Sequence, residues 1–264
     1  MKRIFVIPVN DGEAVEIRNI LTTSGEQVLI TGQPWGATWA GLEPALVARL
    51  RELRNSHSDA IIYGIEIGGT PNEDAGYLPV INIDHHRYRD DDRTNPSSSI
   101  EQVATLLEVT LTRYQRFVAA NDVGYIPRML SLGAELGMSA TDIAGMIKLV
   151  RAADRCAQGV TPDDEAQAVR DVQGAVWSNG ALGRRVMVSY TTPSTTAHAD
   201  LLYGKAVEEL FCGPKWIYFG PRHQELYALN LHGSWAGGAA NNGYFGVVAP
   251  DMESRNRIMK IFNS

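Results

Sequence analysis

The 264-residue chain has little cysteine and no long apolar run. Cys156 and Cys212 lie far apart and at no metal-ligand spacing, which excludes a small disulfide-stapled domain and predicts free thiols in a reducing, cytoplasmic compartment. The apolar run after Met1-Lys2-Arg3 is too short for a signal peptide, and no stretch approaches the length of a membrane span. We therefore expect no membrane association.

An excess of positive charge is also missing. The sequence has 24 Lys and Arg against 30 Asp and Glu, a formal net charge of −6. Binding to a long nucleic-acid duplex normally needs a basic face, so we expect no such partner. Small phosphorylated ligands remain compatible with this charge, because a bound metal ion can supply positive charge locally.

The first half of the chain alternates between strand and helix patterns. Hydrophobic residues make up 44% of the sequence, which is ordinary for a folded protein of this length. The predicted strands are residues 3–9, 27–31, 60–67 and 80–83, and the predicted helices are residues 14–21, 42–53 and 100–118. Such alternation predicts an α/β fold, a parallel sheet covered by helices. Further helices are expected at residues 126–136, 140–157 and 162–177.

The pattern changes after residue 178. Ser178-Asn179-Gly180 is typical of a turn. We therefore predict that residues 179–184 form a linker between a first domain, residues 1–178, and a second domain, residues 185–264. The second domain is predicted to be a smaller α+β unit. Its expected strands are residues 185–190, 216–219, 226–231 and 245–248, with a helix at 199–211 and a glycine-rich loop at 233–243.

An acid and two adjacent histidines, Asp84-His85-His86, directly follow the apolar strand 80–83. The carboxyl ends of parallel strands meet at one edge of a sheet, where α/β folds place their ligands. Acids also follow other predicted elements there: Asp11, Glu13, Glu66 and Asp122. Carboxylates and imidazoles suit Zn²⁺ or Mn²⁺. The alternative is a pair of surface histidines in a charged loop.

A longer combination of motifs resembles the DHH phosphoesterase superfamily. It comprises Asn82-Ile83-Asp84-His85-His86, then Asn95-Pro96-Ser97-Ser98-Ser99, then a helix leading to Asp122-Val123-Gly124. The tail at residues 236–243 is similar to the glycine-rich substrate loop of the associated DHHA1 domain. The resemblance implies a DHH-type first domain with a DHHA1-like second domain.

The resemblance also implies roles for particular residues. The implied metal ligands are Asp11, Glu13, Glu66, His85 and Asp122. The implied catalytic residues, beside the attacked phosphate, are His86 and Asp84. The implied substrate-binding residues are Gly237, Gly238, Arg87 and Ser98. The implied cofactor is Mn²⁺, or Mg²⁺ or another divalent ion, with one or two ions per chain.

The chain departs from the family pattern at four positions. Ile7 stands where the first motif has a histidine, and Ala239 replaces a histidine of the glycine-rich loop. Glu13 and Glu66 stand where aspartates are usual, and each adds one methylene, roughly one C–C bond of extra reach. Ser98 with Glu101 also fits a helix-capping box, so its role as cap or phosphate ligand is left open.

The leading hypothesis is therefore a metal-dependent phosphoesterase that hydrolyses a phosphodiester in a small nucleotide or a short single-stranded oligonucleotide. The alternative is a catalytically impaired protein that binds a nucleotide or phosphorylated metabolite. Trp35 and Trp39 suit either base stacking or core packing. A homodimer is left open.

Overall fold

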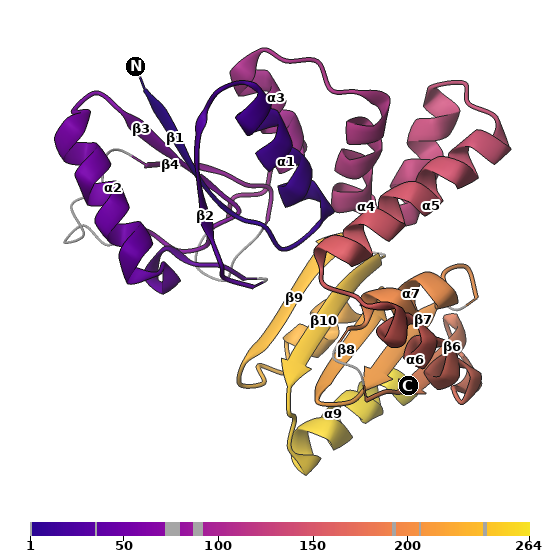
Figure 1. The fold of residues 1–264 in the computed structure, drawn as a ribbon. Coiled ribbons are helices and arrows are strands. Elements are labelled where there is room, and N and C mark those ends of the chain that lie inside the picture. Colours follow the sequence, from indigo (N-terminus) through magenta and orange to yellow (C-terminus); the bar gives the residue numbers. More distant parts are fainter. Residues whose placement is uncertain are drawn as a thin grey trace. The chain divides into compact units, whose positions relative to one another are not determined.

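The computed structural model describes residues 2–34, 36–71, 80–86, 92–191, 194–205, 207–239 and 242–264. The chain forms two compact units, Met1–Gln158 and Gly159–Ser264 (Figure 1). Within the described residues, no helix combines the length and the hydropathy that crossing a membrane requires.

The first unit is built on a four-stranded sheet in the order β2-β1-β3-β4. Its strands are β1 (Arg3–Pro8), β2 (Gln27–Thr31), β3 (Ile61–Ile65) and β4 (Val80–Ile83), and every pairing is parallel. This confirms the predicted α/β class. The central strand β1 is almost wholly buried, as expected for an apolar run covered on both faces.

The strand period of two divides the core between the two faces of this sheet. Phe5 and Ile7 pack against α1 (Gly12–Thr23) and α3 (Ser99–Leu107). Ile4 and Val6 face the other way and pack against α2 (Pro44–Ser56), together with a short 3-10 turn, η1 (Trp39–Gly41). Figure 1 shows the sheet between α2 on one side and α1 with α3 on the other.

The helix predicted at residues 100–118 is two helices. Helix α3 ends at Glu108, which adopts a left-handed conformation (φ 56°), and α4 (Arg113–Glu135) starts after Thr112. Thr112 and Gln115 form a reciprocal capping box at this second start. Apolar residues recur at helical spacing throughout residues 100–118, so this pattern did not indicate that a helix ends near Glu108. The Thr-x-x-Gln spacing, however, marks the start of the second helix in the sequence.

Helix α4 is kinked at Gly124 (φ −166°, ψ 18°) and Tyr125 (φ 56°, ψ −150°). Pro127 follows, and a proline has no N–H for the preceding turn, so it favours the start of a new helical segment here. Asp122 therefore lies at the carboxyl end of the first segment, close to where the sequence predicts the helix to end. Helix α5 (Ala140–Ala157) packs against α4 and completes the unit.

The second unit contains a six-stranded sheet in the order β5-β6-β7-β8-β10-β9. Among these strands, β6 and β7 pair in parallel and the other pairings are antiparallel. Its elements are α6 (Pro162–Gln173), β5 (Val176–Gly180), β6 (Gly183–Ser189), α7 (Thr196–Leu202), β7 (Glu208–Cys212), β8 (Lys215–Gly220), α8 (His223–Tyr227), β9 (Ser234–Ala239), β10 (Asn242–Val248) and α9 (Met252–Asn263).

This unit differs from the sequence-based expectation in several places. The predicted linker 179–184 is the turn of the β5–β6 hairpin, with Gly180 opposite Gly183, and the two compact units divide at Gln158 instead. Helix α6 belongs to the second unit, where Val172 packs against its core. Glycine and asparagine mark a hairpin turn as well as a linker, so composition alone did not distinguish them.

Three further expectations for this unit were wrong. The predicted strand 226–231 begins as the end of α8, and the predicted helix 199–211 is α7 followed by β7. The predicted glycine-rich loop 233–243 is largely the β9–β10 hairpin. Residues 208–212 and 234–239 are strands because they pair with neighbouring strands, which their own sequence pattern does not reveal.

Candidate metal centre

Acids and histidines converge at the carboxyl edge of the first sheet, as the sequence predicts. Glu66 follows β3, and His85 follows β4, its parallel neighbour. Glu13 comes from the first turn of α1, and Asp122 from α4. One ligand-type atom from each of these four residues lies within 4.8 Å of all the others. The geometry predicted from sequence for Glu66, His85 and Asp122 is therefore present.

Capping interactions hold the two acids of α1. Asp11 is the N-cap of α1, and its Oδ1 accepts from Ala14 N at 2.8 Å. The Oε1 atom of Glu13 accepts from Ile100 N in the first turn of α3, at 2.9 Å. Both carboxylates thus lie at helix N-termini, where the exposed N–H groups and the helix dipole stabilise negative charge. The second oxygen of Glu13, Oε2, takes no part in this capping.

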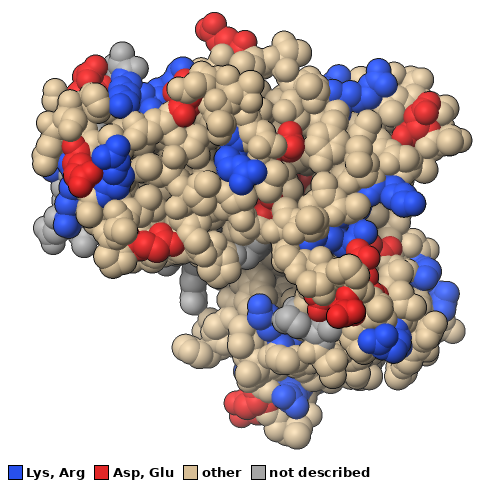
Figure 2. Space-filling model, in the orientation of Figure 1, with Lys and Arg blue, Asp and Glu red and all other residues tan. Residues whose placement is uncertain are grey.

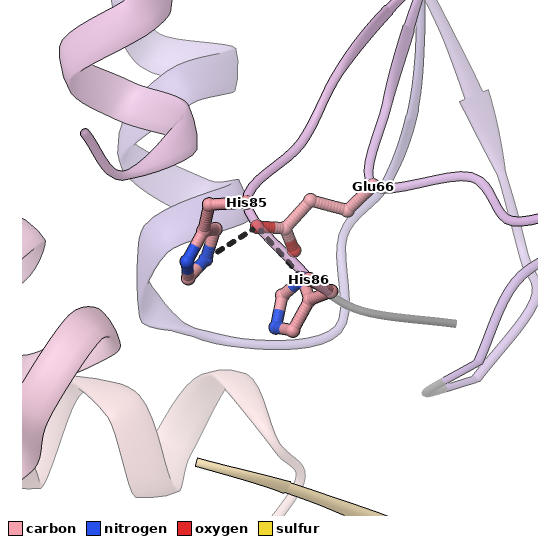
Figure 3. A group of neighbouring side chains, drawn as sticks. All are labelled: Glu66, His85 and His86. Atoms are coloured by element: carbon pink, nitrogen blue, oxygen red, sulfur yellow. Dashed lines mark ion pairs between the residues drawn. The ribbon is translucent and has the colours of Figure 1, made fainter. Parts of the chain in front are cut away.

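Glu66 occupies a strained backbone position. Its φ is 50°, a left-handed value that is uncommon outside glycine, while its N–H donates to Ile83 O at 3.0 Å. Its Oε1 accepts from Ser99 Oγ at 2.9 Å and lies 3.5 Å from His85 Nε2 and 3.9 Å from His86 Nδ1. Figure 3 shows both imidazoles directed toward this carboxylate. Glu66 is therefore placed between the two histidines.

Three atoms at the centre of this group are buried and have no hydrogen-bond partner among the described residues: Glu13 Oε2, His85 Nε2 and Asp122 Oδ2. His85 Nε2 and Asp122 Oδ2 approach to 2.5 Å, yet without hydrogen-bond alignment. Buried polar atoms in folded proteins nearly always form hydrogen bonds, whereas here His85 and Asp122 form only an ion pair and Glu13 Oε2 forms no hydrogen bond among the described residues. A cation held between them is the simplest explanation.

The pKa directions agree with a shortage of positive charge. Burial, together with the negative charges of Glu66 and Asp122, raises the pKa values of Asp11 and Glu13 well above their ordinary values. Burial lowers the pKa of His85, but Asp122 and Glu66 outweigh it and raise that pKa to about 10. The protonated imidazole thus neutralises the carboxylates that a divalent ion would otherwise neutralise.

The donor set fits a divalent transition metal. One imidazole nitrogen and three carboxylate groups, from His85, Glu13, Glu66 and Asp122, can converge on one ion. An imidazole ligand is more typical of sites for Mn²⁺, Zn²⁺ or Fe²⁺ than of sites for Ca²⁺ and Mg²⁺, which prefer oxygen ligands throughout. A second group, Glu66, His85 and His86, shares two members with the first. The chain therefore carries side chains suited to a divalent metal.

Asp84 organises the loop after β4. It is buried, and its Oδ1 accepts from the backbone N–H of His85 (2.8 Å) and of His86 (3.0 Å) and lies 3.0 Å from His86 Nδ1. Arg93 Nη1 lies 3.4 Å from its other oxygen. Asp84 therefore holds the loop, and its predicted catalytic role stays a prediction.

His86 is the more accessible histidine. Its side chain is 26% exposed, against 9% for His85. Burial lowers the pKa of His86, but Asp84 and Glu66 outweigh this, so that the net pKa is raised. An accessible, orientated imidazole thus lies beside the acidic group, and the position of His86 next to a substrate stays a prediction.

Asp11 and Ile7 lie outside the ligand groups found among the described residues. Asp11 is not one of the four converging residues, although its charge interacts with Glu66 and Asp122. Ile7, at the position of the missing histidine, is fully buried in the apolar cluster with Phe5 and α1. Among the described residues the structure thus assembles two overlapping groups, and neither includes Asp11.

The remaining predicted site residues have other surroundings. Ser98 is fully buried, its hydroxyl accepts from Glu101 N, and its own N–H donates to Glu101, so it caps α3, while its substrate-binding role stays a prediction. Gly237 and Gly238 lie in β9, and Gly238 has a φ of 88°. Arg87 and Trp35 lie outside the described residues. Trp39 is a core residue that donates to Asn82 Oδ1.

Sequence reasoning missed residues that support the group from outside the motifs. Asn10 Oδ1, beside Asp11, is another buried atom without a partner among the described residues. Ser99 donates to Glu66, and Asp154 Oδ1 accepts from Gly12 N at 2.9 Å. Asn10 and Ser99 adjoin motif residues and could have been found from that. Asp154 carries no sequence signal, because it lies on a distant helix.

The chain resembles a known protein in its fold. No protein-family model matches the chain, and no curated protein matches it. A solved structure described as a DHH domain, from a member of a family of ribosomal proteins, matches with a TM-score of 0.57 and 13% identity, covering 99% of this chain and 85% of that one. The chain therefore shares the fold of that DHH-domain structure, with a parallel α/β unit and a smaller second unit.

A second match is more distant. It is a pGpG-specific phosphodiesterase from Vibrio cholerae, with a TM-score of 0.38 and 11% identity, covering 98% of this chain and 96% of that one.

Proposed function

We propose that this protein is a divalent-metal-dependent phosphoesterase that hydrolyses a phosphodiester in a small nucleotide or a short single-stranded oligonucleotide. One observation carries the proposal. In a DHH-type fold, three buried ligand atoms from Glu13, His85 and Asp122, none with a hydrogen bond among the described residues, converge with Glu66 at the carboxyl edge of the sheet. Such a site is costly to fold unless a cation compensates it.

Glu13, Glu66, His85 and Asp122 would hold the ion. When bound, a divalent ion lowers the pKa of a water ligand and neutralises negative charge that develops on a phosphoryl group. The protein fixes the ligands from outside: Ile100 N holds Glu13, and Ser99 holds Glu66. Mn²⁺ is our choice for the ion, in one or two copies, with Asp11 available to a second.

His86 would act on the substrate directly. Asp84 Oδ1 lies against its Nδ1, which selects the tautomer with the proton on Nδ1 when the ring is neutral. Asp84 and Glu66 raise the pKa of His86 despite its burial, which shifts the ring toward its protonated form. In that form it can donate to a phosphoryl oxygen or to the leaving oxygen. General acid catalysis of this type contributes typically about 10²–10⁴-fold.

The substrate class follows from charge and from the second unit. The net charge of −6 disfavours a long duplex, and on the face drawn in Figure 2 the Lys and Arg side chains are interspersed with Asp and Glu. Gly238 is exposed and has no side chain, so a ligand could approach its backbone closely, whereas the space beside Gly237 holds the Tyr244 ring. We include them, and Arg87, as substrate-binding candidates.

The competing proposal is a nucleotide-binding protein without turnover. Ile7 favours it, because an apolar core residue occupies the position of an expected metal-binding histidine. This alternative keeps the ion and the ligand but loses hydrolysis.

The test combines metal titration with hydrolysis assays on dinucleotides and short single-stranded oligonucleotides. We expect Mn²⁺ to bind to the wild type and activate it. Asp122→Asn should weaken Mn²⁺ binding, whereas His86→Gln should lower kcat by about 10²–10⁴-fold while Mn²⁺ binds within a few-fold of wild type. His232→Gln, at an exposed position in the second unit, is the control and should behave as wild type.

The outcomes separate the proposals. Binding of Mn²⁺ and nucleotide without hydrolysis would support the binding protein. Absence of any bound divalent ion, even in excess Mn²⁺, would refute the metal centre itself.

A further inference from the structure

We propose that the buried pair Arg151–Asp154 on α5 positions the proposed metal ligands of two other helices. Neither residue belongs to the ligand group, and the proposal rests on the proposed function. Both side chains are almost completely buried, with 6% and 5% of the residues exposed. The pair links the turn that carries Asp11 and Glu13 to the segment that carries Asp122.

Asp154 holds the start of α1. Its Oδ1 accepts from Gly12 N at 2.9 Å, and Gly12 stands between the two acids of the first motif. The backbones approach so closely that a Cβ on Gly12 would lie 3.2 Å from Asp154 Cα. Asp154 Oδ2 accepts from Arg151 at 2.7 Å and from Gln158 at 2.9 Å. This carboxylate is therefore fully engaged and directed at the α1 turn.

Arg151 holds the kinked part of α4. Its Nη1 donates to Asn121 Oδ1 at 2.9 Å, and Asn121 immediately precedes Asp122. Its guanidinium lies 4.7 Å from the centre of the Tyr125 ring. Tyr125 has the strained conformation that produces the kink. Arg151 thus contacts the residues on both sides of the Asp122–Gly124 segment.

The energetics favour a positioning role. A buried ion pair often adds little net stability compared with apolar residues, because both charges lose their hydration. Its distinctive property is direction, since planar guanidinium and carboxylate groups bind only along fixed vectors. Residues that orientate metal ligands typically change metal affinity by about 10–100-fold when they are lost.

The experiment measures Mn²⁺ affinity by calorimetry, well below the melting temperature of each variant. Arg151→Met removes the contacts to Asn121 and Asp154 and should weaken Mn²⁺ binding by about 10–100-fold in folded protein. Arg151→Lys keeps the charge and should restore part of the affinity. Arg128→Met, which breaks the exposed Arg128–Glu135 pair on α4, is the matched control and should leave affinity unchanged.

A purely structural role predicts lower melting temperatures with unchanged Mn²⁺ affinity, and that result would overturn the proposal. Asp154→Asn serves if Arg151→Met fails to fold, because its amide oxygen can still accept from Gly12 N, while its NH2 group replaces the oxygen that accepts from Arg151 and Gln158. It should also weaken Mn²⁺ binding.

Hydrogen exchange separates this proposal from the proposed function. If the wild type binds no Mn²⁺, the proposed function fails, and the amide protons decide the positioning role. In Arg151→Met the amides of Gly12 and of residues 121–126 should exchange faster than in the control variant. Unchanged exchange there would refute the proposal independently of any metal.

Discussion

Glu13→Gln should stabilise the metal-free protein and destabilise the metal-bound one. Glu13 is buried, and its pKa is raised by burial and by the charges of Asp122 and Glu66. Glutamine keeps an oxygen for Ile100 N and replaces Oε2, unpaired among the described residues, with an N–H donor facing these carboxylates. The change removes a buried charge while retaining the structural hydrogen bond.

The expected magnitude without metal is about 1–3 kcal/mol in favour of the variant, the usual cost of an unsatisfied buried polar group. That corresponds to a rise of roughly 2–4 °C in melting temperature per kcal/mol for a unit of this size. The difference in stability between the variant and the wild type depends on pH. Because the folded pKa of Glu13 lies above its ordinary value of 4.5, the wild type loses stability as pH rises above 4.5. The advantage of the variant should disappear below that pH.

With Mn²⁺ the order should reverse. Binding stabilises the wild type by about 4.1 kcal/mol at a free ion concentration roughly 1,000 times Kd, which exceeds the advantage of about 1–3 kcal/mol that the variant has without metal. Losing a carboxylate ligand should cost at least the roughly 10–100-fold typical of an outer contact, so the variant gains much less. The assay is differential scanning calorimetry of the Mn²⁺-sensitive transition, with and without the ion, between pH 4 and pH 8.

Glu16→Gln is the matched control on the same helix. Glu16 is half-buried and pairs with Gln115, outside the ligand group. It should show no dependence on Mn²⁺. If Glu13→Gln lowers the melting temperature without metal, or if Mn²⁺ stabilises both proteins equally, the reasoning about Glu13 is wrong.

Three further predictions concern other residues. Ile7→His should lower the melting temperature, because an imidazole enters a fully buried apolar cluster. If Ile7 occupies the position of the family's metal-binding histidine, calorimetry should also show tighter binding of Mn²⁺ at a second site. Burial, and then the charge of Asp200, raise the pKa of Glu209 in the folded protein from 4.5 to about 8. Glu209→Gln should therefore stabilise the protein increasingly as the pH rises from 4.5 to about 8, and should have no such effect below pH 4.5. Equal curves of stability against pH for the two proteins would contradict this. Gly64→Ala should destabilise by about 1–3 kcal/mol in denaturant titrations, because the added Cβ would lie 2.3 Å from Trp39 Cζ2.

Several features could be read from the sequence because they depend on nearby residues. Strand–helix alternation predicted the parallel sheet, and the position of Glu66 and of His85 directly after strands predicted that they meet at one edge. The end of the first helical segment of α4 near Asp122 followed from Gly124 and Pro127. These signals are local, so no knowledge of partners was required.

Other features depend on contacts between segments that lie far apart in the sequence, so the sequence alone did not determine them. The break after Glu108 and the boundary at Gln158 depended on which segments pack together, and the apolar period alone did not reveal them. The capping role of Ser98 was confirmed only by its burial and its bonds to Glu101.

By itself, then, the sequence determined the sheet, its edge and the residue types at that edge, since strand period and motif position are properties of short stretches. Only the tertiary structure decided which atoms of those residues are engaged. Glu13 bonds to Ile100 across 87 positions and Gly12 to Asp154 across 142, and hydrogen bonds between such distant residues leave no local pattern. The buried atoms that indicate a metal became visible only when the partners of the other described residues had been assigned.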